Sequence, residues 1–437
     1  YWAASRTLRT KMNLLLKTYG QLHMGRALII WSSVCVALTV STAHAYVGLD
    51  PAYTGVEYDS YLKAPADLIE DQGLSFFASL GLSATYDDNI YREEFDEQNA
   101  MIYKVLPALE GRGERGSTKY NFGYKGNYGK YSGGPADDLD DYTNHIGYAG
   151  IYHKGSRTNS SLYGDYTRGS TPRGQNNFEE KDVWNQGSII GKVDFGARDS
   201  RFRLRLTGQA KKREYDINQA NDLNNTGVGA VLGMGIAPKT RLVLDGGYVR
   251  FEYPNNNRDA DRNYLRAGVS WEATAKTTGF ISYGKEKYKP DNPGQPVDSD
   301  EEGTAQGFVT ENDTDTWKGV LTWLPRKRDS FTLDTSRATK EGFGVGSNRV
   351  ATRSSINWGH TWSESTSSNV SYRFGNDDYI GSLREDDIGS LFVGFGYRFR
   401  RNHIFRGFWN YETRDSNIPL ESYDVNRFTL LYGFTYP

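Results

Sequence analysis

The chain has 437 residues, including 48 glycines, 31 tyrosines and 20 phenylalanines, and its formal net charge is −2 at pH 7. Hydrophobic residues make up only 37% of it, and no apolar run after residue 45 is long enough for a membrane-spanning helix. These values exclude a helical membrane domain beyond the N-terminus, and the charge does not suggest nucleic-acid binding. The same values do not exclude a transmembrane β-barrel, because half of each barrel strand is polar and lowers the average hydropathy.

The N-terminal region has the pattern of a secretory signal peptide. A positive start at Arg26 precedes the apolar stretch 27–40, and Ala43 and Ala45 frame a small-x-small cleavage site. The alternative is an N-terminal anchor helix. Cleavage after Ala45 removes Cys35, the only cysteine, so the mature chain is expected to have no disulfide and no thiolate-bound metal. The predicted divisions are an upstream or extended N-terminal segment at 1–23, a signal peptide at 24–45 and a periplasmic lead-in at 46–73.

From Leu74 to Tyr436 the sequence repeats one unit in which apolar and polar residues alternate. Successive side chains of a strand point to opposite faces, so each unit has one apolar and one polar face. When every strand alternates, the apolar face can meet lipid and the polar face water, as in a transmembrane β-barrel. We predict a barrel over 74–437 with eighteen strands, at 74–86, 100–110, 118–130, 142–153, 160–168, 185–195, 201–213, 227–237, 241–252, 263–273, 278–289, 315–324, 330–339, 350–361, 368–375, 388–399, 404–413 and 426–436.

The connections between these strands alternate without exception between short turns and longer polar loops. Outer-membrane barrels have short periplasmic turns and longer extracellular loops. The fold class is therefore expected to be all-β, an antiparallel up-and-down barrel of about eighteen strands with both chain ends in the periplasm. The longest loop, 290–314, is the candidate for a plug inside the lumen, and 376–387 is expected to be another of the long loops.

The cost of placing charge in lipid orients the strands. A Lys or Arg facing lipid at mid-bilayer costs roughly 2–4 kcal/mol, whereas one in a water-filled lumen costs little. Strand 201–213 should then turn Phe202 and Leu204 outward. By the same rule the basic residues predicted to line the pore are Arg203, Arg205, Lys211, Arg266, Arg353, Arg373, Arg398 and Arg406.

Two interpretations of this basic lumen stay open. Guanidinium groups bind carboxylate or sulfate in a fixed fork geometry, so the lumen could attract anions. Alternatively, inward acids could pair with the basic groups and stiffen the wall without selectivity; Asp194, Asp245, Asp334 and Glu412 are the candidates. This assignment predicts few inward aromatic residues, with Phe77 and Phe408 the better candidates, so the sequence does not predict a continuous surface for stacking sugars.

In two predicted strands, the alternation does not assign every residue clearly to the outer or the inner face. In 241–252, Arg250 and Glu252 share the parity of the outward residue Leu244, which requires either a rim position or a β-bulge. In 278–289, Phe280 competes with Ile281 for the outer face, and the register stays open.

The last strand carries the most specific local pattern. Its aromatic and apolar side chains alternate toward one face, as in the C-terminal assembly signal of outer-membrane barrels, although Pro437 follows the final aromatic residue. The alternative is an edge strand of a soluble sandwich. The residues of the predicted signal are Phe428, Leu430, Tyr432, Phe434 and Tyr436.

The sequence has few patterns that are typical of catalytic sites. The mature chain keeps four histidines on separate strands or turns, namely His145, His153, His360 and His403, and shows neither the H-E-x-x-H nor the G-x-S-x-G pattern. Acidic residues cluster in the loops, most densely at 298–302, but without the glycine spacing of a calcium loop. Solvated loop charge is therefore favoured over a cation site. We expect no enzyme activity, no catalytic residue, no cofactor and no metal site.

The first strand ends in Tyr-Asp-Asp-Asn-Ile-Tyr-Arg, at residues 86–92. This ending, together with the overall plan of a signal peptide and one barrel, resembles the beta-barrel porin 2 family of outer-membrane proteins. Several members accompany genes for exopolysaccharide or capsule synthesis and export. The resemblance implies a conduit through the outer membrane for a secreted polysaccharide, and it transfers no site residues. Locally, Asp and Asn also favour turns, so the same residues could simply end a strand.

Three functions are consistent with these features. The leading hypothesis is a pore for export of an extracellular or capsular polysaccharide; the alternatives are a general or anion-preferring diffusion porin, and a surface structural or adhesive barrel acting through its long loops. The expected location is the outer membrane of a Gram-negative bacterium. The expected partners are outer-membrane lipid and lipopolysaccharide, the barrel-assembly machinery, a periplasmic polysaccharide-export protein, and anionic polysaccharide or small solutes, with no nucleic acid.

Overall fold

The computed structural model describes residues 74–133, 140–171, 173, 181–197, 199–274, 276–294, 296–297, 307–308, 310–340, 348–400 and 402–436. The predicted signal peptide with its cleavage residues Ala43 and Ala45, the lead-in, and much of the candidate plug at 290–314 lie outside these residues. Within the described part of the chain, no helix is long and apolar enough to cross a membrane.

One antiparallel sheet of eighteen strands closes on itself. A separate small pair, β12 (Pro296–Val297) and β13 (Gly307–Phe308), and one helical turn, η3 (Gln219–Asn221), lie in connections. The closed all-β barrel predicted from the alternation is confirmed, and each predicted strand has one counterpart. The barrel strands are β1 (Leu74–Asp87), β2 (Ala100–Arg115), β3 (Thr118–Ser132), β4 (Tyr142–Lys154), β5 (Thr158–Thr171), β6 (Asp182–Phe195), β7 (Phe202–Tyr215), β8 (Leu223–Ala237), β9 (Thr240–Glu252), β10 (Ala260–Thr274), β11 (Thr277–Pro290), β14 (Asn312–Arg326), β15 (Asp329–Lys340), β16 (Arg349–Thr361), β17 (Thr366–Tyr379), β18 (Glu385–Arg400), β19 (His403–Ser416) and β20 (Tyr423–Tyr436).

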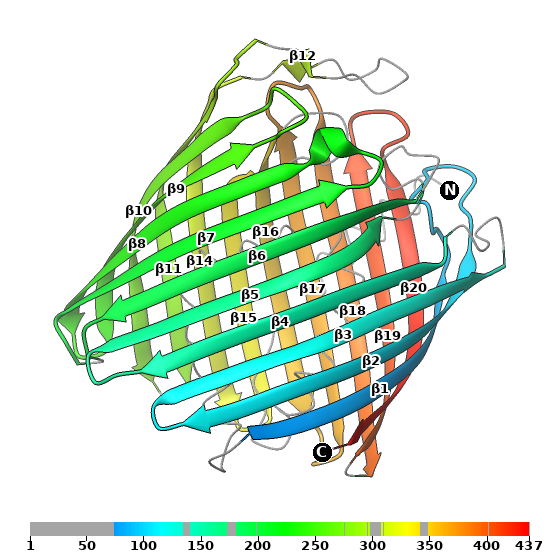
Figure 1. The fold of residues 1–437 in the computed structure, drawn as a ribbon, viewed down its shortest axis with the longest axis horizontal. Coiled ribbons are helices and arrows are strands. Elements are labelled where there is room, and N and C mark those ends of the chain that lie inside the picture. The colour runs from blue at the N-terminus through cyan, green and yellow to red at the C-terminus, as the bar shows by residue number, and fades with distance from the viewer. Residues whose placement is uncertain are drawn as a thin grey trace.

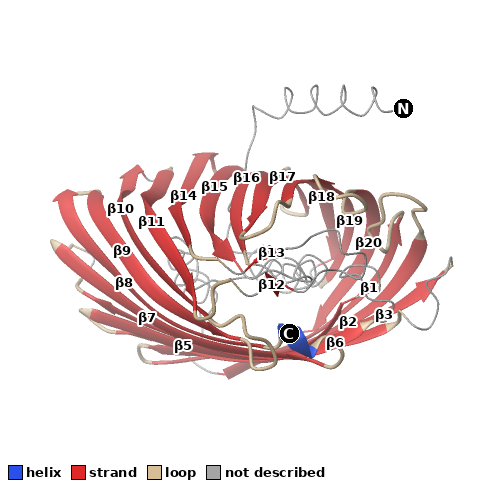
Figure 2. Cartoon of the chain, turned by 90° about the horizontal axis from the view of Figure 1, so that it is seen from above, coloured by secondary structure: helices blue, strands red, loops and turns tan. Residues whose placement is uncertain are grey.

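Each barrel strand pairs with its neighbours in sequence, and the last strand closes the sheet. β20 pairs with β19 on one side and with β1 on the other, where Ala78–Asp87 runs antiparallel to Arg427–Tyr436. β20 is therefore not the edge strand of a sandwich. Figure 1 shows β1–β8 as the near wall and β11–β20 as the far wall, with their strands crossing at a steep angle. Seen from above, the barrel has an elongated outline (Figure 2).

The outer face is the apolar one. On β1 the exposed apolar side chains all stand at even-numbered positions and so share one face. They are Leu74, Phe76, Leu80, Leu82 and Tyr86. Near the short turns the outer face carries clustered rings, as where Trp323 contacts Phe331 at 4.9 Å and Phe399 contacts Phe405 at 5.2 Å between ring centroids. Rings of this kind form the aromatic girdles at the borders of a membrane.

The two strands that did not sort cleanly are resolved by the structure. β9 pairs with β10 without a break, so no bulge lies at Arg250. That side chain is instead at the rim, where it binds Asp291 at 2.6 Å and Asp261 at 3.3 Å. On β11, Ile281 is 53% exposed on the outer face, whereas Phe280 is 7% exposed on the inner face.

One expected loop is shorter than predicted. β17 and β18 extend beyond the predicted strand ends, so only residues 380–384 connect them, not 376–387. This connection is shorter than the turn at 196–201 at the opposite end of the barrel. The predicted loop bounds were therefore wrong, although the connection is still longer than the turns on either side of it, between β16 and β17 and between β18 and β19. The reason is that Asn376, Asp377 and Asp378 still pair in register with β18, although such residues usually favour turns.

The inner face is packed at the two ends of the elongated outline. At one end, around β9–β11, Val249, Phe251 and Tyr288 are buried; at the other, around β20 and β2, Leu431 and Leu106 are buried. The inner face of β4 between these ends has no buried residue. Space for water and solute is therefore expected along the broad walls rather than at the packed ends.

At one packed end, the side chain of Arg266 on β10 connects to β9 on one side and, by crossing β11 at Gly284, to β14. The Arg266 guanidinium donates to Asp245 on β9 at 2.6 Å and to Thr316 on β14 at 3.4 Å, so its side chain crosses the intervening strand β11. Gly284 is the residue of β11 in register with both Arg266 and Thr316. A Cβ atom at Gly284 would lie 1.9 Å from the backbone oxygen of Leu265, so a side chain cannot be accommodated without moving the strand.

We therefore predict that Gly284→Ala destabilises the barrel by roughly 1–3 kcal/mol, the usual cost of overpacking. The check is the melting temperature and the fraction of heat-modifiable, folded barrel on semi-native gels. Gly208→Ala is the matched control, because a Cβ there meets nothing within 4 Å. Equal stability of the two variants would contradict the prediction.

Candidate functional site: the inner wall

All eight basic residues predicted for the pore lie on the inner parity of their strands. On β7, for example, Arg203, Arg205 and Lys211 alternate with Phe202 and Leu206, which are exposed on the outer face. The same alternation holds on β10, β16, β17, β18 and β19 for the other five. That these groups line a conducting pore stays a prediction, but their side of the sheet is known.

Within the part of the chain that the structure describes, Arg205, Arg266 and Arg353 form ion pairs with inner acids. Arg205 lies 2.9 Å from Asp194, Arg266 lies 2.6 Å from Asp245, and Arg353 lies 2.6 Å from Asp377. Two of these acids, Asp194 and Asp245, are among the partners that the second interpretation of the lumen proposed. The third proposed acid, Asp334, accepts a hydrogen bond from Ser355 at 2.7 Å. Pairing favours a stiff wall over strong anion selectivity.

Arg203, Arg373 and Arg406 differ from these three. Among the described residues, none of them forms an ion pair within 4.0 Å. Arg373 is also exposed on the inner face of β17. It is therefore the basic group best placed to act on a solute in the lumen.

Two buried carboxylates face each other near the long-loop end. Asp377 of β17 and Asp386 of β18 are direct neighbours in register and are 2% and 0% exposed. Like charges at such positions repel unless cations neutralise them. Arg349 lies 3.0 Å from Asp377, and Arg384 and Arg414 lie 2.8 and 3.7 Å from Asp386. The arginines thus supply the compensating charge.

The charged network continues across the closure of the barrel. Arg427 of β20 lies 3.3 Å from Glu412 on β19 and 2.8 Å from Asp87 on β1. Arg92, in the loop after β1, adds a second cation 3.5 Å from Asp87. Glu412, the fourth acid proposed from the sequence, is therefore also paired. Acids and arginines are thus interspersed along the inner wall from β16 to β1.

The motif at residues 86–92 fastens the closure. Asp87, Asp88 and Asn89 bind the first residues of β20: Asp87 accepts from Arg427 at 2.8 Å, Asp88 accepts from the backbone nitrogen of Asn426 at 2.6 Å, and Asn89 donates to the backbone oxygen of Asp424 at 3.1 Å. Asn89 is fully buried. The consecutive polar residues thus do more than end a strand; they join the first strand to the last.

The rest of the motif folds inside the mouth of the barrel. Ile90 packs in a buried cluster with Ile102 and Tyr131. The hydroxyl of Tyr91 donates to Asp140 at 3.0 Å and accepts from Arg173 at 2.7 Å. Burial, followed by the hydrogen bond to Asp140, raises the pKa of Tyr91 to about 12. Tyr91 therefore stays protonated at neutral pH.

The inner face also carries aromatic residues that the sequence assignment missed. Tyr148 and Tyr152 on β4, Tyr163 on β5 and Trp184 on β6 are half-buried on the inner face. The expectation of few inward rings was therefore wrong. The alternation along the strand could have identified them. Tyr163 and Asp165 are two residues apart and therefore share a face of β5, and a carboxylate is not expected to face lipid. Phe77 and Phe408 are on the inner face as expected, where Arg112 lies 5.5 Å above the Phe77 ring and Phe392 lies 5.5 Å from Phe408.

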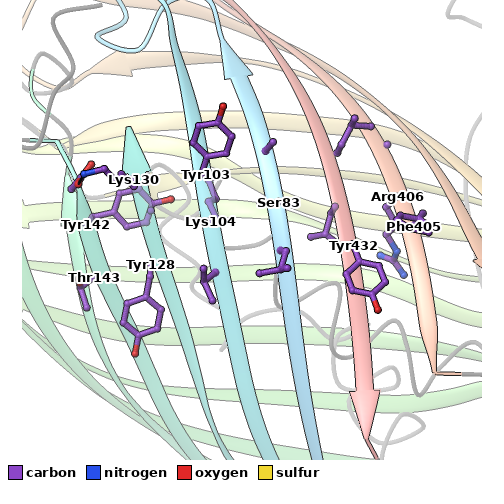
Figure 3. A pocket seen from close by; sticks show the side chains of 18 of the residues that line it. Ser83, Tyr103, Lys104, Tyr128, Lys130, Tyr142, Thr143, Phe405, Arg406 and Tyr432 are labelled. Atoms are coloured by element: carbon purple, nitrogen blue, oxygen red, sulfur yellow. Dashed lines mark hydrogen bonds and ion pairs between the residues drawn. The ribbon is translucent and has the colours of Figure 1, made fainter. Parts of the chain in front are cut away.

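One hollow lies on the outer face of the barrel. It has a volume of about 1020 Å³ and spans the outer surface from β18 to β4. Figure 3 shows Tyr103, Tyr128 and Tyr432 around it, and these side chains have the outer parity of their strands. Its lining is mainly apolar, so in a membrane it would be occupied by lipid rather than by a solute in transit.

The four histidines all have outer parity and contact outer-face groups. His145 lies 2.6 Å from the hydroxyl of Tyr124, His403 lies 2.7 Å from that of Tyr432, and His360 lies 2.7 Å from Asp329. Among the described residues, no group of three or more His, Cys, Asp or Glu side chains could hold a metal ion. The acidic segment 298–302 lies outside the described residues. That the chain is not an enzyme stays a prediction.

Residues 75–432 match the family described as "Putative beta-barrel porin 2". The chain belongs to this family. It is thus an outer-membrane β-barrel porin, and the resemblance noted at residues 86–92 is confirmed for the whole barrel. No curated protein matches the sequence.

Solved structures of similar fold are those of bacterial porins. OpdK from Pseudomonas aeruginosa, crystallised with vanillate, is 11% identical, with 83% of this chain and 99% of that chain covered and a TM-score of 0.45. A BenF-like porin from Pseudomonas fluorescens is 10% identical with the same coverage and a TM-score of 0.46. OccAB4 from Acinetobacter baumannii is 10% identical, with 84% and 99% covered and a TM-score of 0.43.

We predict that Asp88→Ala weakens the closure between β1 and β20. The change leaves the backbone nitrogen of Asn426 without its 2.6 Å acceptor, and an unsatisfied buried donor costs about 1–3 kcal/mol. Thermal unfolding followed by circular dichroism should show a lower melting temperature than for the wild type. Asp88→Asn keeps an acceptor oxygen and should lose less; a larger loss for Asn than for Ala would contradict this account.

Proposed function

We propose that this porin is a water-filled channel for passive diffusion of small polar solutes, with weak ion selectivity. The observation that carries the proposal is the pairing of inner charges on a closed sheet whose outer face is apolar. An eighteen-stranded barrel is wide enough to leave an aqueous channel. Such a channel needs no energy source, because a solute follows its own concentration gradient.

The paired charges support weak selectivity. A fixed ion pair presents a small net field to a passing ion, whereas an isolated cation attracts anions at short range. Arg205, Arg266 and Arg353 each have an acid within 3 Å. This arrangement favours general diffusion over the anion-preferring alternative.

We predict that the purified chain forms ohmic channels in planar bilayers with a reversal potential near zero in a salt gradient. Arg373→Glu should shift the reversal potential toward cation preference, because Arg373 is an exposed inner cation without an ion pair among the described residues. Lys285→Glu is the matched control, since Lys285 is exposed on the outer parity of β11 beside Asp315. It should leave the reversal potential unchanged.

Two results would count against this proposal. Silent bilayers, with folded protein verified by heat modifiability, would mean that the barrel is closed or needs a partner. A strong anion preference in the wild type would restore the anion-preferring alternative, because it would mean that inner cations outside the described ion pairs, such as Arg373, dominate the field.

Export of an extracellular or capsular polysaccharide is the second candidate function. It was inferred from the family resemblance, and the half-buried rings of Tyr148, Tyr163 and Trp184 on the inner face favour a carbohydrate in the lumen. Deletion of the gene followed by quantification of surface polysaccharide tests it; unchanged secretion would rule it out. A periplasmic polysaccharide-export protein would be the expected partner in that case.

We further propose an orientation of the barrel in the membrane and an assembly signal on its last strand. We place both chain ends in the periplasm, because the shorter connections lie mostly at the end of the barrel where β1 begins. The C-terminal assembly signal is proposed for β20, where Phe428 and Leu430 are exposed on the outer face. For an adhesive role through the long loops, no contact among the described residues gives support.

A further inference from the structure

The short turns of the barrel carry an excess of exposed basic side chains. These turns all lie at the end of the barrel where β1 begins (Figure 1). Each of them except the turn at 362–365 has at least one exposed Lys or Arg within it or directly beside it. Among the described residues at the same positions, the acids are Asp199, Asp329 and Glu364. The short-turn end is therefore net positive.

The long-loop end of the barrel has a different charge balance. The connection 88–99 contains five acidic residues and one basic residue. On the outer face near that end, Lys212 lies 2.7 Å from Glu214 and Lys285 lies 2.7 Å from Asp315. Because the whole chain has a formal net charge of −2, the positive charge of the short turns belongs to that end and does not reflect the overall composition.

The cations are densest around the turn between β14 and β15. We call this group of four exposed side chains the basic corner; it consists of Lys276, Arg326, Lys327 and Arg328. The Lys276 ammonium donates to the backbone oxygen of Pro325 at 2.9 Å, and the Arg328 guanidinium donates to that of Trp362 at 3.2 Å. Both acceptors are neutral carbonyl groups, so these two contacts hold the side chains without removing their charge.

Two acids lie near the basic corner. Asp329 follows it directly in sequence, but its side chain is only 15% exposed and lies 2.7 Å from His360 on the neighbouring strand. Glu364 is exposed in the next turn. Four cations beside two acids leave the corner with a net positive charge.

Exposed aromatic rings lie beside the basic corner on the outer face. Trp323 is 46% exposed and contacts Phe331 at 4.9 Å between ring centroids, and Trp362 is 54% exposed. Tryptophan rings on the outer face of a barrel lie at the level of the lipid headgroups. The basic corner is therefore expected at the level of the phosphate groups of the adjacent leaflet.

We propose that the basic corner is a binding site for the headgroup of an anionic phospholipid in the leaflet at the short-turn end. Lys and Arg side chains near a membrane surface attract anionic headgroups, and a guanidinium group matches the oxygens of a phosphate in a fixed fork geometry. The neighbouring indole rings would contact the glycerol region and the upper acyl chains. A soluble acidic ligand would use the cations but not these exposed rings, so a membrane lipid is favoured. The site lies outside the lumen and does not depend on what the channel conducts.

The test titrates the full chain, solubilised in an uncharged detergent, with phosphatidylglycerol or phosphatidylcholine and measures bound lipid by native mass spectrometry. The wild type should bind phosphatidylglycerol more tightly. The triple variant Arg326→Gln, Lys327→Gln, Arg328→Gln should weaken phosphatidylglycerol binding roughly tenfold and leave phosphatidylcholine binding unchanged. Lys327→Gln alone, which should weaken it roughly threefold, is a second variant in case the triple variant folds poorly.

The matched control removes three cations from the outer face near the long-loop end. Arg168→Gln, Lys212→Gln, Lys285→Gln makes the same change in net charge, but each of these cations has an acid within 4 Å. This control should bind phosphatidylglycerol like the wild type.

Three results would overturn the lipid site. They are equal binding of the two lipids by the wild type, equal losses in the two triple variants, and binding of polyaspartate as tightly as phosphatidylglycerol, which would indicate a soluble acidic ligand. None of these results bears on conductance in planar bilayers, so failure of this site is distinguishable from failure of the proposed function.

Discussion

The structure depends on one requirement, that every backbone N–H and C=O group inside a membrane has a partner within the protein. A sheet meets this requirement only when it has no edge. The contacts between β1 and β20 remove the last two edges, over Ala78–Asp87 and Arg427–Tyr436. All other features of the barrel, including which residues face the lumen, presuppose that closure.

The closure is reinforced where the two strands leave the apolar zone. Asp87, Asp88 and Asn89 bind side-chain and backbone groups of β20, and Arg92 adds a cation beside Asp87. The segment that marks the family resemblance thus has a physical role in the fold. Its presence is explained without reference to any transported substrate, so it is weak evidence for polysaccharide export.

Many charged groups of the inner wall form ion pairs with each other, which leaves fewer of them to interact with a solute. Asp377 and Asp386 are buried side by side, and arginines from neighbouring strands and the 380–384 connection neutralise them. Buried carboxylates require such partners, because an unpaired charge away from water is costly. Under the proposed function we expect the net field of the lumen to be small, with Arg373 as an exposed exception.

The sequence by itself determined the closed barrel, its eighteen strands and the side of the sheet on which each of the eight basic residues lies, because the period of two along a strand is a local property. It did not decide whether Arg205 or Arg266 is paired, because Asp194 and Asp245 come from other strands and only register brings them within 3 Å. It did not show the grouping of Tyr148 with Tyr163, or the rim position of Arg250, for the same reason. Alternation fixes which face a side chain occupies, whereas its neighbours across the sheet are fixed by how the strands are staggered, and that depends on the closure of the whole barrel.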